Sequence, residues 1–265
     1  MDIKLVAFDM DGTLLNSRHE LSPETIRALY KLKEKGIICV ICTGRSIAGL
    51  KHYSELLDLN MPIVTLNGTI ILDKDKNVIF ARTLTLEDAK RIWSLADNLN
   101  ANLALWSNNK LYCNKINKFT LNYSERSYLP ITLIDDFEAF VQDNGISKMI
   151  FFDQEDKIID FKSKVSKIKD FNVNYCISNP YMLEFFNIQV SKANALDFLG
   201  KYYNITPEQM MAFGDGENDI DMLEYVGYGV VMQNALEPVK SHGKFITKTN
   251  DEDGVAYALK KFIRL

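Results

Sequence analysis

Two short apolar segments, far apart in the chain, are each followed at once by a cluster of acidic residues and glycine. Residues 3–8 precede Asp9-Met10-Asp11-Gly12-Thr13, and residues 210–213 precede Gly214-Asp215-Gly216-Glu217-Asn218-Asp219. Short continuous apolar runs that end in turn residues are typical of strands buried in a parallel sheet. In open α/β sheets, ligands bind outside the carboxyl ends of such strands. This feature therefore predicts an α/β fold with its acidic residues at the binding edge of the sheet.

Strand and helix signals alternate on both sides of the middle of the chain. Ser22 and Pro23 supply a cap and a first-turn proline for a helix that stops at Gly36. The next expected elements are a strand at 37–42, a helical segment from Thr43-Gly44-Arg45 to about residue 57, a strand near 63–65 and a hairpin of 70–72 with 78–80. Later we expect a helix at 192–203, a strand at 210–214, a helix near 218–225, a strand at 228–232 and a closing helix at 253–263.

The middle of the chain has a different texture. It begins with an acid-capped helix at 86–99 and continues with short strand candidates in a region rich in Tyr, Phe, Asn and Lys. We therefore expect residues 1–82 and 190–265 to form one catalytic domain with a Rossmann-like parallel sheet. Residues 83–189 are expected to form an inserted α/β cap domain that selects the substrate. The predicted fold class is α/β.

Composition argues against several classes of function. The formal net charge of −4 and the absence of a Lys/Arg-rich run give no attraction for nucleic acid. No stretch approaches the roughly 18–20 apolar residues that are needed to cross a bilayer, so we expect no membrane partner and a cytoplasmic protein. The proportions of hydrophobic and charged residues, 47% and 25%, are those of a soluble globular protein.

The cysteines and histidines do not suggest a disulfide scaffold or a zinc site. Cys39 and Cys42 have CxxC spacing, but they lie in an expected strand and point to opposite faces, so we interpret them as core residues. The three histidines have no partner at a zinc-ligand spacing, and we expect them at surface or cap positions; they are His19, His52 and His242.

The acidic residues predict a metal site. Asp9, Asp11, Asp215 and Asp219 at neighbouring strand ends would repel one another unless a cation lies between them. Oxygen ligands and an incomplete set of protein donors favour Mg²⁺, which shares its coordination shell with water and a substrate phosphate.

Two further groups are suited to bind that phosphate. Thr43 and Gly44 follow a strand and precede a helical segment, where a hydroxyl and backbone N–H groups can receive an anion. Lys192 begins an expected helix, where the macrodipole opposes a lysine, so a purely local structural role is less favoured.

Taken together, the motifs resemble those of the haloacid dehalogenase superfamily. Asp-Met-Asp-Gly-Thr-Leu-Leu, Thr-Gly-Arg, the region of Lys192 and Gly-Asp-Gly-Glu-Asn-Asp-Ile-Asp-Met-Leu occur in the order of its four motifs. The chain is most similar to the Cof-type hydrolases, which insert a large α/β (C2-type) cap between the second and third motifs. One departure is Ala193, where those proteins usually have glycine.

The resemblance implies a Mg²⁺-dependent phosphatase that hydrolyses small-molecule phosphate monoesters, such as sugar phosphates or phosphorylated cofactors, through an aspartyl phosphate. Asp9 would be the nucleophile, and Asp11 the acid and base. The metal would be held by Asp9, the Asp11 backbone carbonyl and Asp215, while Asp219 orders these ligands. The phosphate would be bound by Thr43, Gly44, Lys192 and Asn218.

Two other functions remain open at the level of sequence. A phosphomutase uses the same constellation but transfers the phosphate to a second hydroxyl. A phosphate-accepting signalling or binding module also carries a phosphorylated aspartate beside acids, Thr and Lys, although Asp11 and the insert argue against it. Neither the leaving group nor the oligomeric state is indicated by these residues.

Overall fold

The computed structural model describes residues 2–50, 53 and 60–263 of the chain. It contains two compact units, residues 1–44, 53–80 and 191–265 forming the first and residues 45–52 and 81–190 the second. The domain boundaries expected from the sequence, 82/83 and 189/190, stay a prediction. Residues 45–50 differ from that expectation, because they group with the second unit, where the 3₁₀ turn Ala48–Leu50 contacts helix α4 (Lys118–Ser127).

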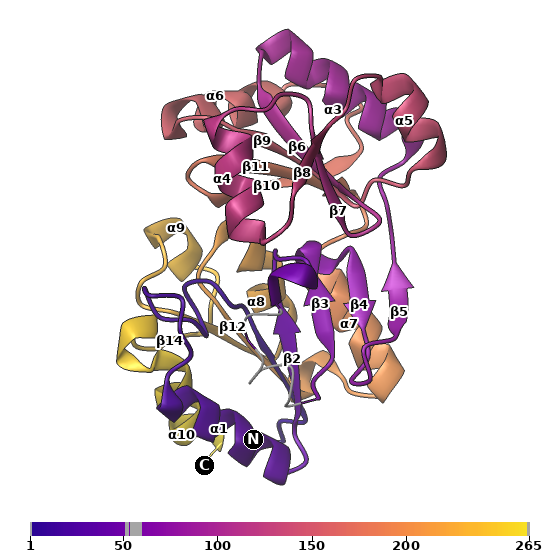
Figure 1. Cartoon of the computed structure of the whole chain (residues 1–265). Helices are drawn as coiled ribbons and strands as arrows, with labels where there is room; N and C mark the ends of the chain where they lie inside the picture. The colour runs from indigo at the N-terminus through magenta and orange to yellow at the C-terminus, as the bar shows by residue number, and fades with distance from the viewer. Residues whose placement is uncertain (1, 51–52, 54–59, 264–265) are drawn as a thin grey trace. The chain divides into compact units, whose positions relative to one another are not determined.

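An eight-stranded sheet forms the centre of the first unit (Figure 1). Its strand order is β14-β13-β12-β1-β2-β3-β4-β5, and the strands from β14 to β3 run parallel. The strands are β1 (Leu5–Phe8), β2 (Ile38–Cys42), β3 (Ile63–Thr65), β4 (Ile70–Leu72), β5 (Val78–Ala81), β12 (Met210–Gly214), β13 (Tyr228–Val231) and β14 (Phe245–Ile246). The predicted α/β fold with a parallel sheet is confirmed.

Strand β1 lies where the order of the sheet reverses. The chain moves from β1 to β2 and β3 on one side, and it returns to β12, β13 and β14 on the other. In doubly wound sheets this switch point opens the crevice that binds ligands. The register pairs Phe8 with Phe213, so the residues that follow the two strands emerge side by side at the same edge. Both acidic clusters of the sequence therefore meet at the switch point.

Helices cover both faces of this sheet (Figure 1). The helices are α1 (Pro23–Glu34), α7 (Lys192–Tyr203), α8 (Ile220–Tyr225), α9 (Glu237–Lys240) and α10 (Gly254–Ile263). The Oγ of Ser22 accepts a hydrogen bond from the Thr25 N–H, as expected of an N-cap. Helices α7 and α8 pack on alternate residues of the strands, such as Leu5 and Ala7, while α1 packs against α10.

Several boundaries differ from the expectations. The segment expected as one helix near 218–225 is a 3₁₀ turn, Glu217–Asp219, followed by α8. The closing helix begins one residue late, because Asp253 has the left-handed φ of 56° that ends the preceding turn. Helix α9 and strand β14 were not expected, since short elements give weak periodic signals. Of the helical segment expected up to residue 57, residues 51–52 and 54–57 lie outside the described residues, and the described part contains the 3₁₀ turn Ala48–Leu50.

The second unit has its own sheet, of order β10-β11-β9-β6-β7-β8. The strands are β6 (Asn102–Ser107), β7 (Lys110–Cys113), β8 (Ile131–Leu133), β9 (Lys148–Phe152), β10 (Val173–Asn179) and β11 (Met182–Asn187), and the helices are α3 (Leu86–Leu99), α4, α5 (Phe137–Asp143) and α6 (Glu155–Val165). One sheet face packs against α3, α5 and α6 in a large apolar cluster that includes Leu105, Phe151 and Phe185.

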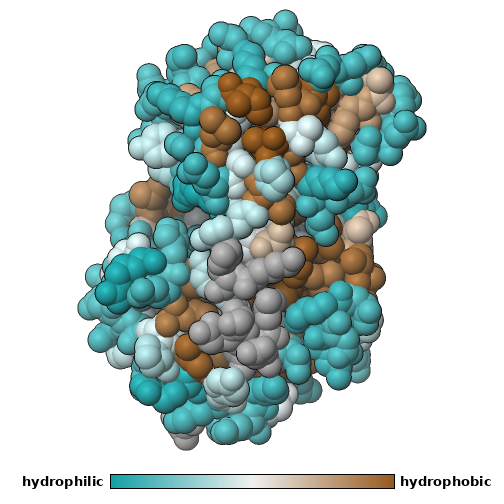
Figure 2. All heavy atoms as spheres, in the orientation of Figure 1, coloured by the Kyte–Doolittle hydropathy of each residue, from teal (hydrophilic) through white to brown (hydrophobic). Residues whose placement is uncertain are grey.

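The surface and the cysteines are ordinary for a globular chain. In Figure 2 hydrophilic residues predominate, and hydrophobic residues gather in patches between them. Within the described residues, no helix combines the length and the apolar character needed for a membrane span. Cys39 and Cys42 are buried in β2, and burial raises the pKa of the Cys39 thiol to about 12, which agrees with a core role. The cytoplasmic location stays a prediction.

Candidate active site

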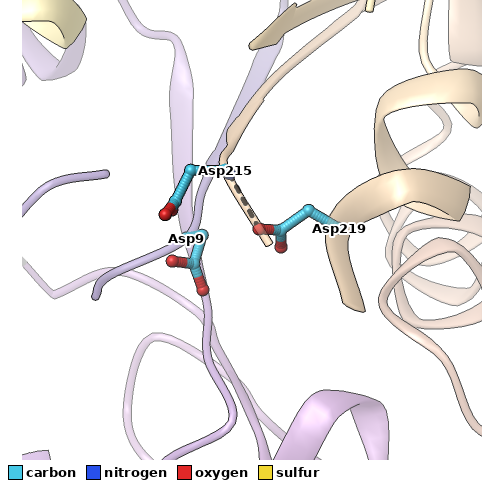
Figure 3. Close-up of side chains that lie close together, drawn as sticks. All are labelled: Asp9, Asp215 and Asp219. Carbon is cyan, nitrogen blue, oxygen red and sulfur yellow. Dashed lines mark hydrogen bonds between the residues drawn. The ribbon is translucent and has the colours of Figure 1, made fainter. Parts of the chain in front are cut away.

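Three carboxylates meet at the carboxyl ends of β1 and β12. Asp9 follows β1, Asp215 follows β12, and Asp219 ends the 3₁₀ turn before α8. One oxygen of each lies within 4.8 Å of the others. In Figure 3, Asp9 and Asp215 extend from the adjacent strand ends, and Asp219 approaches them from the helical side. The fold thus brings Asp9, near the start of the chain, together with two acids from its last quarter.

Lys192 lies against two of these carboxylates. It is the first residue of α7, behind the N-cap Ser191, and its side chain has no exposed surface. Its Nζ donates to Oδ1 of Asp9 and to Oδ1 of Asp219, each at 2.6 Å. Burial alone would lower the pKa of Lys192, but the two carboxylates outweigh it and raise the pKa above its usual value. The lysine is therefore a fixed positive charge.

Asp219 is held by bonds within the first unit. Its Oδ1 accepts from Lys192, and its Oδ2 accepts from the backbone N–H groups of Asp215 and Gly216, at 3.0 and 2.9 Å. Both oxygens are thus used to fix the loop after β12. This arrangement suits a residue that orients its neighbours rather than one that binds a ligand.

Asp9 and Asp215 each retain one oxygen for a ligand. In the described part of the chain, the side-chain hydrogen bonds and ion pairs of both residues involve Oδ1, with Lys192 for Asp9 and the Thr13 hydroxyl at 2.8 Å for Asp215. The two Oδ2 atoms make none of these contacts. Burial raises the pKa of Asp9 well above its usual value, and Lys192 opposes this only in part. Burial, together with Asp219, raises the pKa of Asp215 to about 7.

These shifts share one physical cause. Two buried carboxylates and the half-buried Asp215 face one ammonium, so negative charge is in excess and protons are bound more tightly. A divalent cation would remove the excess, and an all-oxygen donor set with few protein ligands is the kind that Mg²⁺ prefers. The residues present therefore fit such a cation.

Gly12 allows this close approach. Its φ of 84° is in the left-handed region, and a Cβ there would lie 2.2 Å from Oδ2 of Asp215. Any side chain would displace the carboxylate as well as strain the backbone. Gly12 therefore gives the Asp215 carboxylate its space and allows the backbone conformation of the turn.

Asp11 lies apart from the buried cluster. Its carboxylate is exposed and lies 3.3 Å from Nδ1 of His19, which has a left-handed φ of 58°. His19 is a surface residue, as expected, and His242 lies at the surface beside Glu224, whereas His52 lies outside the described residues. An exposed carboxyl group beside a buried acidic site is well placed to exchange protons with water.

The phosphate-binding candidates lie at the same edge of the sheet. Thr43 is buried at the end of β2, and Gly44 follows it. Nδ2 of Asn218 donates to Oδ1 of Asn67 at 2.9 Å. The sequence did not single out Thr13, His19 or Asn67 for a role in the site. The position of Asn67 just after β3 could have indicated the same sheet edge.

A comparison with known families decides which kind of protein carries this site. A family model described as haloacid dehalogenase-like hydrolase matches residues 6–259. The chain belongs to this family. The resemblance inferred from the motifs is thereby confirmed.

Other haloacid dehalogenase-like hydrolases match nearly the whole chain. The 5-amino-6-(5-phospho-D-ribitylamino)uracil phosphatase YcsE of Bacillus subtilis is 31% identical over 99% of this chain and 97% of its own length. A solved haloacid dehalogenase-like hydrolase from B. subtilis has 27% identity and a TM-score of 0.89, covering 98% of this chain and 100% of that one. The subclass IIB sugar phosphatase BT4131 has 25% identity and a TM-score of 0.87, covering 99% and 100%.

Ala193 is the point where this haloacid dehalogenase-like hydrolase departs from the expected motif. It is the second residue of α7, directly after Lys192. Alanine has the best intrinsic helix propensity, about 1 kcal/mol better than glycine. The alanine therefore supports the helix that carries the buried lysine.

Proposed function

We propose that this enzyme is a Mg²⁺-dependent phosphatase that hydrolyses phosphate monoesters of small metabolites through a phosphorylated Asp9. The observation that carries the proposal is the buried Asp9 carboxylate, which is held by Lys192 on one oxygen and faces Asp215 with the other. A carboxylate can form a covalent intermediate that divides one difficult displacement into two easier steps.

In the first step, Oδ1 of Asp9 attacks the phosphorus and the bond to the ester oxygen breaks. That oxygen takes the proton of the Asp11 carboxyl group and leaves as an alcohol. Lys192 lies beside Oδ1, so its positive charge stays next to the bond that forms. Because phosphoryl transfer depends mainly on positioning and electrostatics, this fixed ammonium is a main contribution of the protein.

In the second step, water attacks the phosphorus and gives its proton to Asp11. The bond between phosphorus and Oδ1 breaks, which releases inorganic phosphate and restores Asp9. The first step leaves Asp11 as the carboxylate that the second step needs, and the proton taken from water restores its carboxyl group for the next cycle. Nδ1 of His19 lies 3.3 Å from Oδ1 of Asp11 and helps to position this carboxyl group.

Mg²⁺ would be held by Oδ2 of Asp9, Oδ2 of Asp215 and the backbone carbonyl of Asp11. When bound, it supplies positive charge that offsets the excess of carboxylates and the charge of the phosphate. Thr43, Gly44, Lys192 and Asn218 would bind the phosphoryl oxygens. The substrate class follows the names of the relatives, one a phosphatase of a ribitylamino-uracil phosphate and the other a sugar phosphatase.

The test is release of inorganic phosphate from a panel of sugar phosphates and phosphorylated cofactor precursors. The wild type with Mg²⁺ should release phosphate from some of them without a sugar-bisphosphate activator, which a phosphomutase would require. A phosphorylated protein that persists for many minutes without turnover would instead favour the signalling module. Asp9→Asn should be inactive, and the exposed Asp160→Asn in α6 is the matched control.

A further inference from the structure

Asn67 is a buried polar residue at the edge of the sheet that carries the site. It follows β3 in the 3₁₀ turn Leu66–Gly68, has a left-handed φ of 57° and is 3% exposed. We propose that Asn67 is a positioning residue of the phosphate-binding site, which holds the Asn218 carboxamide and the Thr43–Gly44 backbone in register. This inference rests on the proposed phosphatase function.

The contacts of Asn67 join two separate loops. Its backbone N–H donates to the Thr43 carbonyl oxygen at 2.9 Å, and its Oδ1 accepts from Nδ2 of Asn218 at 2.9 Å. A Cβ placed on Gly44 would lie 3.2 Å from Oδ1 and 3.5 Å from Nδ2 of Asn67. The carboxamide therefore lies directly against the Gly44 backbone. One side chain thus links the loop after β2 to the loop after β12.

The bond to Asn218 has a chemical consequence. A carboxamide can turn either its oxygen or its NH₂ group toward a ligand, and an oxygen would repel a phosphate. Because Oδ1 of Asn67 accepts one N–H of Asn218, the NH₂ end of Asn218 is fixed at this point. Its second N–H remains to donate to a phosphoryl oxygen. Asn67 acts on the phosphate through Asn218.

A turn residue alone would not need this side chain. The other described asparagines with positive φ are all exposed, as expected where only the backbone conformation matters; they are Asn60, Asn100, Asn108, Asn109 and Asn204. Asparagine and glycine both tolerate the left-handed region. The burial of Asn67 and its bond to Asn218 distinguish it from this group.

The main variant is Asn67→Gly, which keeps the backbone conformation and removes the carboxamide. Asn204→Gly, at the C-cap of α7 with a φ of 56°, makes the same change at an exposed position near the far end of the helix from Lys192. Three quantities are measured for each variant: KM and kcat with an aryl phosphate, and the inhibition constant of inorganic phosphate. Thermal unfolding is followed in parallel.

We expect Asn67→Gly to raise KM and the inhibition constant of inorganic phosphate together, by roughly 5- to 30-fold, as for the loss of one oriented hydrogen bond to a charged group. Asn204→Gly should change neither by more than about twofold. Asn67→Asp keeps an acceptor for Asn218 but adds a negative charge, so it should weaken phosphate binding at least as much while it keeps the fold.

A double-mutant cycle separates a positioning role from independent contacts. If Asn67 acts through Asn218, Asn67→Gly should add little to the loss caused by Asn218→Ala. Effects that multiply, or an unchanged inhibition constant in Asn67→Gly, overturn the inference while leaving the phosphatase intact. A wild type that neither releases phosphate nor is inhibited by inorganic phosphate overturns the proposed function and this inference with it.

Discussion

Each of the two units buries a lysine, and the two lysines have different surroundings. In the first unit, Lys192 donates to Asp9 and Asp219 at 2.6 Å, with Asp215 in the same cluster. In the second unit, Lys148 of β9 donates to Glu184 of β11 at 2.8 Å, and the two side chains are 1% and 4% exposed. The Lys192 ammonium lies among several carboxylates, because Asp221 also interacts with it, whereas the Lys148 ammonium forms its ion pair with Glu184.

This difference distinguishes a buried charge cluster that can bind a ligand from a buried ion pair that has only a structural role. Burial lowers the pKa of Lys148, but its partners, with Glu184 foremost and Tyr123 and Cys176 contributing, together raise it above its usual value. Around Lys192 negative charge remains in excess, and the pKa values of Asp9 and Asp215 rise. A buried cluster with excess negative charge can bind a cation. A buried ion pair whose charges cancel has no such excess and is not expected to bind one.

The largest expected effect is that of Asp9→Asn, which should lower turnover by at least ~10⁴-fold, as for the loss of a nucleophile. The stability of the Asp9→Asn variant, in contrast, should not fall. In the absence of metal the free energy of unfolding should stay the same or rise, because one of the repelling carboxylates is neutral. Phosphate release and urea unfolding in chelator measure both. A destabilised Asp9→Asn would contradict the charge excess inferred for this site.

Removal of the metal should reduce turnover by on the order of 10³-fold, since a divalent charge stabilises the phosphoryl transition state by several kcal/mol. Activity is measured after exhaustive chelation and again after Mg²⁺ is restored. Asp160→Asn should respond like the wild type, because Asp160 is an exposed partner of Lys164. Full activity without metal would show that Lys192 alone balances the carboxylates.

Asp11→Asn should lower turnover by ~10²–10⁴-fold, the usual range for loss of a proton-transfer group. The carboxylate is exposed, so stability should hardly change. With an activated aryl phosphate, whose leaving oxygen needs little help from a proton, formation of the aspartyl phosphate should suffer less than its hydrolysis. Rapid-quench measurement of both steps is the test. Equal losses in both steps with every ester would assign Asp11 another role.

Glu184→Gln should destabilise the protein by about 3–5 kcal/mol, because it leaves the buried Lys148 charge uncompensated. The double variant Lys148→Met with Glu184→Leu should recover most of this loss, since an apolar pair of similar volume can replace a buried ion pair. Urea unfolding of the three proteins measures the effect. If Glu184→Gln leaves the free energy of unfolding unchanged, Lys148 does not depend on Glu184 for its charge balance. The contrast drawn between Lys148 and Lys192 would then be wrong.

The smallest effect concerns pH. The pKa of Asp215 is about 7 in the folded metal-free protein and ~3.9 in an unfolded chain, so the folded state binds more protons between these values. The free energy of unfolding without metal should therefore fall as pH rises from about 4 to 7.

Mg²⁺ needs the ionised carboxylate, so its stabilisation should be about 2–3 kcal/mol at pH 8 when its concentration is ~100 times Kd, and clearly smaller at pH 5. Thermal unfolding with and without Mg²⁺ tests this. Asp215→Asn should reduce the difference between the two pH values, and what remains is due to Asp9, whose pKa is also raised. A stabilisation that is equal at pH 5 and pH 8 in the wild type would remove Asp215 from the metal site.

The sequence by itself determined the local elements of the first unit. Helix α7 and strand β12 have the expected bounds, Lys192–Tyr203 and Met210–Gly214, and Ser22 caps α1 as expected. These features depend on residues a few positions apart, through capping, apolar spacing and turn residues, so they can be read from the chain. The acids after the two strands could be assigned to a binding edge for the same reason.

Only the tertiary structure decided which atom of each side chain at that edge contacts which partner. Asp219 uses both oxygens on Lys192 and the loop after β12, whereas Asp9 and Asp215 keep Oδ2 for a ligand. The link between Asn67 and Asn218 also joins distant segments. Such contacts depend on strand order and register, which place residues together by packing rather than by spacing in the chain. For this reason the sequence identified the acids of the site but not the partner of each oxygen.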